Sequence, residues 1–404
     1  MKSILLLTPI YPADDLLKES TPVVHYFAKE WASLGHNVVV MHYIVNFPQV
    51  VYWLAKPFTT ILESKMGSNI RMYKAKYREY ELDGVQVCRI PLKKLRPHTR
   101  YSQGQIEQAY KKTIEYCDKI GFKPDVVVSH FINPCYELMH RLKQKFTVPT
   151  CYVAHDKGAD FLGIYRNECQ EYIRETNVIG YRSLPIKKQF EKNFKCCDKP
   201  NFMCYSGVPE KYIDSVGEVH RNFTDVSKFI YVGTFMQRKY PAEIVPAVHA
   251  AMGGLGFSIS YVGSGHEEER IKLLANQHQC ADKVHVLGRV ERGKVIELLK
   301  QNDVFIMISK WETFGLVYLE AMAVGCITVA SKNEGFDGII EDGVNGFLCE
   351  AGNVDELSEI IRKIRSMSAE DLSKISRNAI ETARRLTDKN VAKDYLDSVL
   401  KTIK

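Results

Sequence analysis

Short apolar runs alternate with amphipathic stretches along this chain, and the alternation begins twice. In the first half the apolar runs cover 4–7, 38–41, 125–129 and 149–154. In the second half they cover 229–232, 257–262, 283–287, 303–308 and 326–330. Apolar residues at helical spacing fill the gaps, at 104–120, 134–145, 241–252, 266–278, 293–301, 316–324 and 353–367. Strands that alternate with helices favour a doubly wound parallel sheet, so the sequence predicts two Rossmann-like α/β domains.

The length of the chain suits this division. Its 404 residues are long for one ordinary domain and enough for two. The polar stretch 206–224 has no clear periodicity, so we place the boundary at its start. We predict an N-terminal domain at 1–205, a C-terminal domain at 206–385 and a final helix within 386–404. Ligands of such sheets bind beyond the carboxyl ends of the strands, so the cleft shared by the two domains is the expected site.

Composition narrows the class of protein. Hydrophobic residues make up 45% and charged residues 25% of the chain, which is typical of a globular protein. The net charge of +7 suits an anionic ligand or an anionic membrane face, but is too small to argue for nucleic acid. No run reaches the ~18 apolar residues of a spanning helix. The eleven cysteines show no zinc spacing and no signal peptide precedes them, so we expect reduced thiols, no metal site and a cytoplasmic location.

Two carboxylates, Glu312 and Glu320, lie on either side of a turn after the apolar run 303–308. We expect Glu312 in the loop and Glu320 one turn into the following helix, where the amides of Gly315 and Leu316 favour an anion. A ligand with a phosphate and several hydroxyls suits this arrangement, and a nucleotide-sugar is such a ligand. The alternative interpretation is a pair of ordinary surface glutamates.

Residues 309–325 resemble the E-x-F-G-x-x-x-x-E signature of the retaining glycosyltransferases of family 4, the glycogen-synthase-like group. The residues in register are Glu312, Phe314, Gly315, Glu320, Ala321 and Gly325. The resemblance implies the GT-B fold, in which two facing Rossmann-like domains carry the acceptor (N-terminal domain) and the nucleotide-sugar (C-terminal domain). It also implies that the last helix crosses back to the first domain.

The same resemblance implies roles for residues in the second half. Glu320 would bind the ribose hydroxyls, and Glu312 would contact the donor sugar, assisted by backbone amides from Phe314 to Leu316. No metal or other cofactor is expected, because the UDP- or GDP-sugar donor is itself the substrate and cationic groups take the metal's place.

Basic residues follow the strand expected at 229–232. The family carries G-R-x-x-x-x-K here, and its cations hold the diphosphate. Lys239 matches the lysine and Arg238 is its neighbour, whereas Thr234 stands where the family has arginine. Two cations beside a leaving diphosphate would stabilise the charge that develops there. The alternative interpretation is a solvated basic loop.

Further donor contacts are implied in two turns. Gly263 and Ser264 follow the strand at 257–262, and Arg289 and Val290 follow the strand at 283–287, near the nucleobase. The second turn also reads like a phosphate-binding G-x-x-x-x-G-K loop, but a valine replaces the magnesium-binding hydroxyl, which argues against that interpretation.

The first half matches the family loosely. His155 follows the strand at 149–154, where the family has a histidine that faces the donor sugar and the acceptor. A loop histidine with a structural partner is the alternative. The Gly-Gly pair that many members carry after the first strand is missing from residues 8–15.

Residues 44–62 are aromatic and apolar, and a basic cluster follows at Lys93, Lys94, Arg96, His98 and Arg100. Such a combination suits peripheral contact with the inner membrane face and a lipid-linked acceptor. A covered insertion with a solvated loop is the alternative. Aromatic and basic residues also suit single-stranded nucleic acid, but no nucleic-acid motif is present, so we expect no such partner.

Together these features predict a retaining glycosyltransferase. It would transfer a sugar from a nucleoside diphosphate-sugar to a saccharide or lipid-linked saccharide, in cell-surface polysaccharide biosynthesis. Two alternatives stay open at this point: a nucleotide-sugar epimerase with the same two lobes, and a non-catalytic glycosyltransferase-like subunit. Donor turnover without an acceptor would favour the epimerase.

Overall fold

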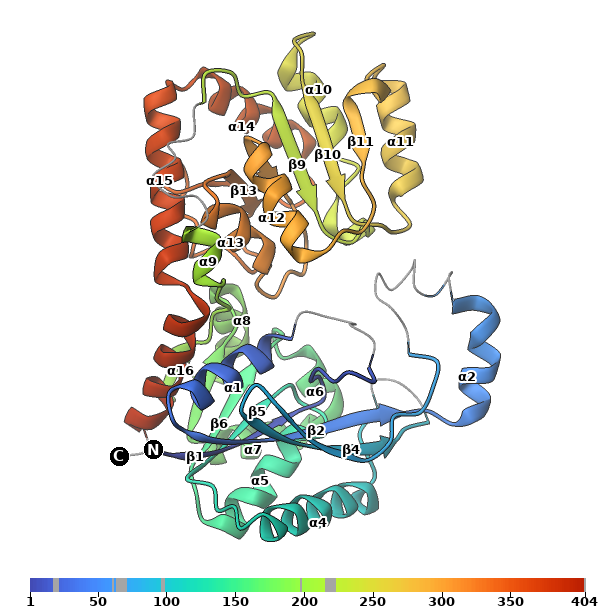
Figure 1. Ribbon diagram of the computed structural model, residues 1–404, viewed down its shortest axis with the longest axis vertical. Coiled ribbons are helices and arrows are strands. Elements are labelled where there is room, and N and C mark those ends of the chain that lie inside the picture. The colour runs from blue at the N-terminus through green and yellow to red at the C-terminus, as the bar shows by residue number, and fades with distance from the viewer. Residues whose placement is uncertain are drawn as a thin grey trace.

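The structure is a computed structural model with two α/β units, each built around one sheet (Figure 1). It describes residues 1–16, 22–59, 62, 71–95, 99–196, 198–214 and 223–402. The predicted α/β fold with two mostly parallel sheets is confirmed. Within the described residues, no helix is both long and apolar enough to cross a membrane.

The first sheet has the strand order β3-β4-β2-β1-β5-β6-β7-β8. Its strands are β1 Ser3–Thr8, β2 Asn37–Asn46, β3 Arg78–Leu82, β4 Val85–Lys93, β5 Val126–His130, β6 Thr150–Ala154, β7 Val178–Tyr181 and β8 Asn201–Met203. All neighbours pair in parallel except β3 and β4. Asp83 and Gly84 join that antiparallel pair with positive φ angles of 50° and 75°. Both residues tolerate this backbone, which is what a two-residue hairpin requires.

Helices cover both faces of the first sheet. The helices of this unit are α1 Val23–Ser33, α2 Gln49–Ala55, α4 Gln103–Lys119, α5 Cys135–Phe146, α6 Ala159–Tyr165, α7 Cys169–Glu175 and α8 Leu184–Phe194, of which α2 lies away from the sheet (Figure 1). Successive side chains of a strand alternate between faces, so Ile4 and Leu6 join one core cluster with Trp31. Leu5 and Leu7 join the other core cluster. Burial on both faces explains why β1 is a continuous apolar run rather than an alternating one.

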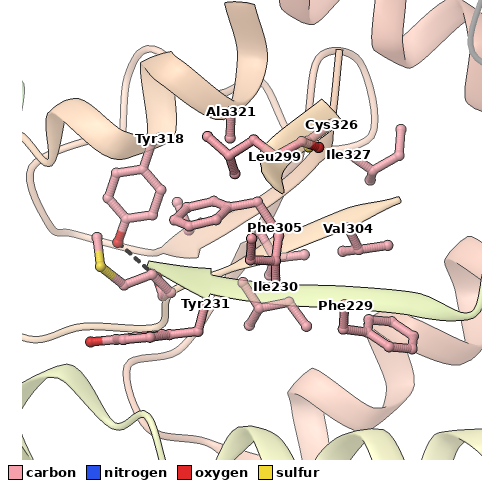
Figure 2. Packing of buried hydrophobic residues seen from close by; sticks show 14 of the residues in the cluster. Phe229, Ile230, Tyr231, Leu299, Val304, Phe305, Tyr318, Ala321, Cys326 and Ile327 are labelled. Carbon is pink, nitrogen blue, oxygen red and sulfur yellow. Dashed lines mark hydrogen bonds between the residues drawn. The ribbon is translucent and has the colours of Figure 1, made fainter. Parts of the chain in front are cut away.

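The second sheet is entirely parallel, with the order β11-β10-β9-β12-β13-β14. Its strands are β9 Lys228–Val232, β10 Ser258–Val262, β11 Val284–Val286, β12 Val304–Ile306, β13 Ile327–Ser331 and β14 Phe347–Cys349. Its helices are α9 Glu210–Asp214, α10 Ile244–Met252, α11 Glu268–Gln277, α12 Arg292–Gln301, α13 Leu316–Ala323, α14 Val354–Ser366 and α15 Ala369–Arg385. Figure 2 shows side chains of β9, β12 and α13 packed together in this core.

The chain passes between the two sheets twice, at neighbouring points. The amide of Val208 donates to Leu386 O at 3.1 Å, and the amide of Asp388 donates to Val208 O at 2.9 Å. A Cβ on Gly207 would lie 2.4 Å from the backbone nitrogen of Asp388, so only glycine fits this crossing. The last helix, α16 Asp388–Thr402, then packs against α1 and β8 of the first sheet. The domain bounds at 205 and 385 remain a proposal.

Several elements were not predicted. They are β3, β4, β7, β8, β14, α2, α6, α7, α8, α9 and α15. The segment 44–100, for which no strand was predicted, supplies β3 and β4 of the first sheet. Of its basic cluster, Arg96 and His98 lie outside the described residues. Arg100 is held by ion pairs to Glu137 and Glu168 at 3.2 and 2.7 Å, so it has a structural partner.

Candidate active site

The second sheet has a switch point at β9, which lies between β10 and β12. At a switch point, the connections that follow two neighbouring strands run to opposite faces of the sheet. This opens a crevice at the carboxyl ends of the strands. The loop after β9 carries Arg238 and Lys239, and the loop after β12 carries Glu312 to Gly315. The residues predicted from the sequence therefore meet at the position that the topology favours for a ligand.

Glu312 lies against both basic residues of the β9 loop. Its Oε2 is 3.5 Å from Lys239 Nζ and 4.0 Å from Arg238 Nη1. These separations exceed hydrogen-bond length, and this buried oxygen has no hydrogen-bond partner within the described residues. The amide of Lys310 donates to Arg238 O at 2.7 Å and joins the two loops. The three charges are therefore gathered without hydrogen bonds to one another, although Arg238 Nη1 also donates to Lys310 O and Trp311 O at 3.4 and 3.5 Å.

Gly315 caps α13 in the left-handed conformation, with φ 80°. A Cβ there would lie 2.4 Å from the Tyr318 ring, so the turn requires glycine. The hydroxyl of Tyr318 donates to Met307 O at 2.7 Å and ties the helix to the end of β12. Within the described part of the chain, the amides of Leu316 and Val317 have no protein acceptor. They are free donors at a helix N-terminus, where an anion is favoured.

Phe314 has a packing role that the sequence did not reveal. Its side chain is buried, with ring centroids 5.9 Å from Tyr205 and 5.4 Å from Phe336. Arg182 of the first unit lies 5.5 Å from the same ring. Only the backbone of Phe314 is left for a ligand.

The turn after β10 approaches the β9 loop closely. A Cβ on Gly263 would lie 1.9 Å from Gly233 O, so this crossing also requires glycine. Arg289 Nε donates to Ser264 Oγ at 2.7 Å, which brings the two turns expected near the nucleotide together. Val290 is half-buried against the core of the second unit.

Glu320 does not share a contact with the Glu312 cluster. It is buried, and its Oε1 accepts from Arg292 Nε at 2.6 Å. Burial raises the pKa of Glu320, and the Arg292 charge opposes that rise. Arg292 Nη1 also donates to the Tyr26 hydroxyl of α1 at 2.7 Å. If ribose hydroxyls bind Glu320, its carboxylate would therefore accept hydrogen bonds from both the ribose and Arg292.

His155 lies at the carboxyl end of β6 in the first unit and faces the second. Thr313 Oγ1 donates to His155 O at 3.2 Å. Beside it, Lys157 Nζ is 4.0 Å from Glu334 Oε1, and Glu334 Oε2 accepts the Glu312 amide at 3.0 Å. The structure thus brings His155 to the edge of the Glu312 loop.

Sequence reasoning missed Glu334 and Arg292. Glu334 follows β13, the strand next to β12, so its place at a strand end was a usable signal. Arg292 opens α12, and nothing in the sequence tied it to Glu320. The binding roles of all these residues remain predictions.

Comparisons with known proteins agree with this arrangement. The family described as glycosyl transferases group 1 matches residues 216–384. An uncharacterized glycosyltransferase of Methanocaldococcus jannaschii is 25% identical over 294 residues, which are 71% of this chain and 77% of that protein. The N-acetyl-alpha-D-glucosaminyl L-malate synthase of Bacillus anthracis is 29% identical over 174 residues. That match covers 43% of this chain and 44% of the enzyme, which is less than half of each.

Similarity of structure extends over the whole chain. The crystal structure of HepE from Anabaena in complex with UDP has a TM-score of 0.66 with this structure. The match covers 99% of this chain and 100% of HepE, at 16% sequence identity, and so concerns the fold. The family match over the second sheet, the glycosyltransferase relatives and the shared fold over both sheets support a place for this chain among the group 1 glycosyl transferases, the glycogen-synthase-like group with the GT-B fold.

Proposed function

We propose that this chain transfers a glycosyl group from a nucleoside diphosphate-sugar to a saccharide or lipid-linked saccharide, with retention at the anomeric carbon. The observation that carries the proposal is the Glu312–Lys239–Arg238 cluster beside the free amides of α13. A diphosphate between these cations and amides would have its charge neutralised on both sides. The anomeric carbon would then lie toward the edge of the Glu312 loop that contacts His155.

The leaving diphosphate is the part of the reaction that this site serves best. As the bond between the anomeric carbon and the β-phosphate oxygen breaks, negative charge develops on that oxygen. Lys239 and Arg238 would stabilise this charge, and Glu312 would orient both cations and contact the sugar. Glu320 would hold the ribose, and Ser264, Arg289 and Val290 would border the nucleoside. The scheme needs no metal, because the cations and the helix N-terminus supply the positive charge.

A UDP-sugar is the first donor to test, because HepE was solved with UDP. Ligand at about 100 times Kd adds about 2.7 kcal/mol of stability to a folded protein. We expect a rise in Tm with one class of nucleotide-sugar, and the same rise in the presence of EDTA. Loss of the shift in EDTA would contradict the metal-independent scheme. No shift with any UDP-, GDP- or ADP-sugar would contradict the donor site. Donor turnover without an acceptor would replace the proposal by an epimerase.

The acceptor side of the proposal rests on α2, which turns apolar side chains to water. Val50, Trp53 and Leu54 are exposed on α2, with Trp53 71% exposed, and Phe58 is exposed in the 3-10 helix Lys56–Phe58 that follows. The buried Tyr52 anchors this helix, since its hydroxyl accepts the Phe47 amide at 3.0 Å. Lys56 is the only charged residue in this stretch. Aromatic and aliphatic residues with a lysine suit the interface of an anionic membrane.

We therefore propose that α2 docks the enzyme on a membrane that presents a lipid-linked acceptor, as in cell-surface polysaccharide synthesis. Figure 1 shows α2 at the opposite side of the first sheet from α16. Cosedimentation with phosphatidylglycerol vesicles should fall about tenfold in Trp53→Ser. Trp311→Ser is the matched control for vesicle binding, since Trp311 is 68% exposed on the second unit. Equal binding by both variants would contradict docking through α2.

A further inference from the structure

A chain of buried hydrogen bonds links the returning helix α16 to the site. The hydroxyl oxygen of Tyr395 in α16 lies 3.1 Å from His130 Nε2. His130 Nδ1 lies 3.0 Å from His155 Nε2. His130 and Tyr395 are 0% and 1% exposed. Water therefore does not compete for these contacts, and both ring nitrogens of His130 have a fixed partner.

Aromatic packing holds every member of this chain in place. The Tyr395 ring makes edge contacts with Phe27 and Trp31, at centroid distances of 5.2 and 4.9 Å. The Phe131 ring stacks on His155 at 3.9 Å with an interplanar angle of 18°. Phe131 adopts the left-handed backbone, φ 65°, which is costly for an aromatic residue. The surrounding structure thus accepts strain at the position that fixes the His155 ring.

Both imidazoles are neutral at ordinary pH. Burial and then the nearby Arg182 charge lower the pKa of His130 to about 3. Burial, His130 and Arg182 hold the pKa of His155 well below its usual range. A neutral imidazole carries a single N–H, so the two rings must donate in the same direction along the chain.

The hydroxyl of Tyr395 sets that direction. Its possible acceptors are His130 Nε2 and the thiol of Cys151. An imidazole nitrogen is a far better acceptor than sulfur, so Tyr395 donates to His130 Nε2. His130 then donates from Nδ1 to His155 Nε2, and the proton of His155 sits on Nδ1. Among the described residues, this Nδ1 has no hydrogen-bond partner.

We propose that Tyr395 and His130 are positioning residues that fix His155 with its proton on Nδ1, so that it donates to an oxygen of the bound nucleotide-sugar. This inference rests on the proposed function for the identity of the ligand. The tautomer itself does not depend on any ligand. The helix that returns from the second unit therefore sets the chemistry of a first-unit side chain 240 positions earlier in the chain.

Tyr395→Phe tests this, because it removes the hydroxyl and keeps the ring. Tyr43→Phe is the matched control: Tyr43 of β2 is as buried as Tyr395, and its hydroxyl lies 2.8 Å from Thr113 Oγ1. We expect kcat to fall at least about tenfold in Tyr395→Phe, as when a catalytic histidine takes the wrong tautomer. The donor KM should hold, and Tyr43→Phe should keep kcat. In a His155→Ala background, Tyr395→Phe should change kcat less than about twofold, since the two residues act as a unit.

Nitrogen-15 NMR of histidine-labelled protein supplies a readout without substrate. The His155 signals, assigned through His155→Gln, should show a protonated Nδ1 in the wild type and a protonated Nε2 in Tyr395→Phe. A wild-type ring protonated at Nε2 would overturn the inference, as would kcat equal in the Tyr395 and Tyr43 variants. If no nucleotide-sugar binds, the proposed function fails and the NMR result still decides the tautomer.

Discussion

The carboxyl ends of the two sheets hold their polar groups in opposite ways. The second sheet gathers charges from loops that follow neighbouring strands, and Glu312 stays 3.5 and 4.0 Å from its cations. The first sheet holds a neutral, buried chain whose members come from β5, the residue after β6, and α16. Charges that must meet a changing ligand are left loosely paired, whereas the histidine that must keep one tautomer is held through its Nε2 by buried partners. The charged cluster of the second sheet can be predicted from a short sequence motif, whereas the buried chain of the first sheet is recognised only in the folded structure.

The largest expected effect concerns the charged side of this comparison. Lys239→Ala removes a cation beside the leaving diphosphate, so we expect kcat to fall by about 100- to 1,000-fold. Steady-state transfer with a UDP-sugar measures this. Lys272→Ala, which breaks an exposed ion pair of α11, should keep full activity. A Lys239→Ala enzyme within about threefold of the wild type would remove Lys239 from the site.

The next prediction tests how far the candidate active site on the second sheet depends on the backbone conformation of Gly315. Gly315→Ala places a Cβ 2.4 Å from Tyr318 at φ 80°, which should cost about 1–3 kcal/mol. Urea denaturation measures this. Gly104→Ala is the control, because nothing lies within 4 Å of its Cβ in α4; it should gain about 0.5–1 kcal/mol. Equal stability of the two variants would show that the turn relaxes freely.

A pH-dependent effect is expected where the two units join. Burial raises the pKa of Asp388 to about 6 from 3.8, and its Oδ1 has no hydrogen-bond partner within the described residues. The folded state therefore keeps this proton longer than the unfolded chain does, and the wild type loses the resulting stability as pH rises from 3.8 to about 6.

Asp388→Asn carries no charge and avoids that loss. It should be more stable than the wild type by about 1–2 kcal/mol above pH 6.5, after allowance for partial exposure. Below about pH 4 the two proteins should be equally stable. Thermal unfolding across this range measures the difference. Asp394→Asn, at an exposed position of the same helix, should show no such pH dependence. If the difference in stability between Asp388→Asn and the wild type were the same at every pH, titration of Asp388 would not be its cause.

The smallest effect tests the link between the two sheets. Thr313→Val removes the hydrogen bond to His155 O and keeps the side-chain shape. A single hydrogen bond contributes about 1 kcal/mol, so we expect donor affinity to weaken by about fivefold at most. Isothermal titration with UDP measures this. Thr328→Val removes a hydrogen bond to Cys326 O inside the second sheet, so it should lower stability and leave UDP affinity unchanged. If Thr328→Val weakened UDP binding more than Thr313→Val does, the bond between Thr313 and His155 would not be the link between the two sheets.

Much of the fold followed from the sequence, for a physical reason. Strands buried on both faces are continuous apolar runs, and those of β1, β5, β9, β10 and β13 were placed within a residue or two. Two of the missed strands lack this signature: β3 is polar and half exposed, and β8 has three residues. The Asp83-Gly84 turn was a usable hairpin signal.

The candidate site was predictable where its residues are close in sequence. Glu312, Gly315 and Lys239 lie in the second unit, in loops that the family pattern covers. Arg292 bonds Glu320 from another helix, and Tyr395 reaches His130 across 265 positions. Such partners are brought together only by packing, and a single sequence carries no local sign of them. Tertiary contact therefore decided the part of the site that the motif left open.

The return of α16 also has a consequence for how the protein is made. One face of the first sheet, with Ile4, Leu6 and Trp31, is covered by residues that include Val391, Tyr395 and Val399. The ribosome makes these residues after the whole second unit. Part of the apolar surface of the N-terminal half therefore stays exposed until α16 has been synthesised. Exposed apolar surface favours aggregation or chaperone binding. Completion of the first domain is among the last events of synthesis, although its strands are among the first to emerge.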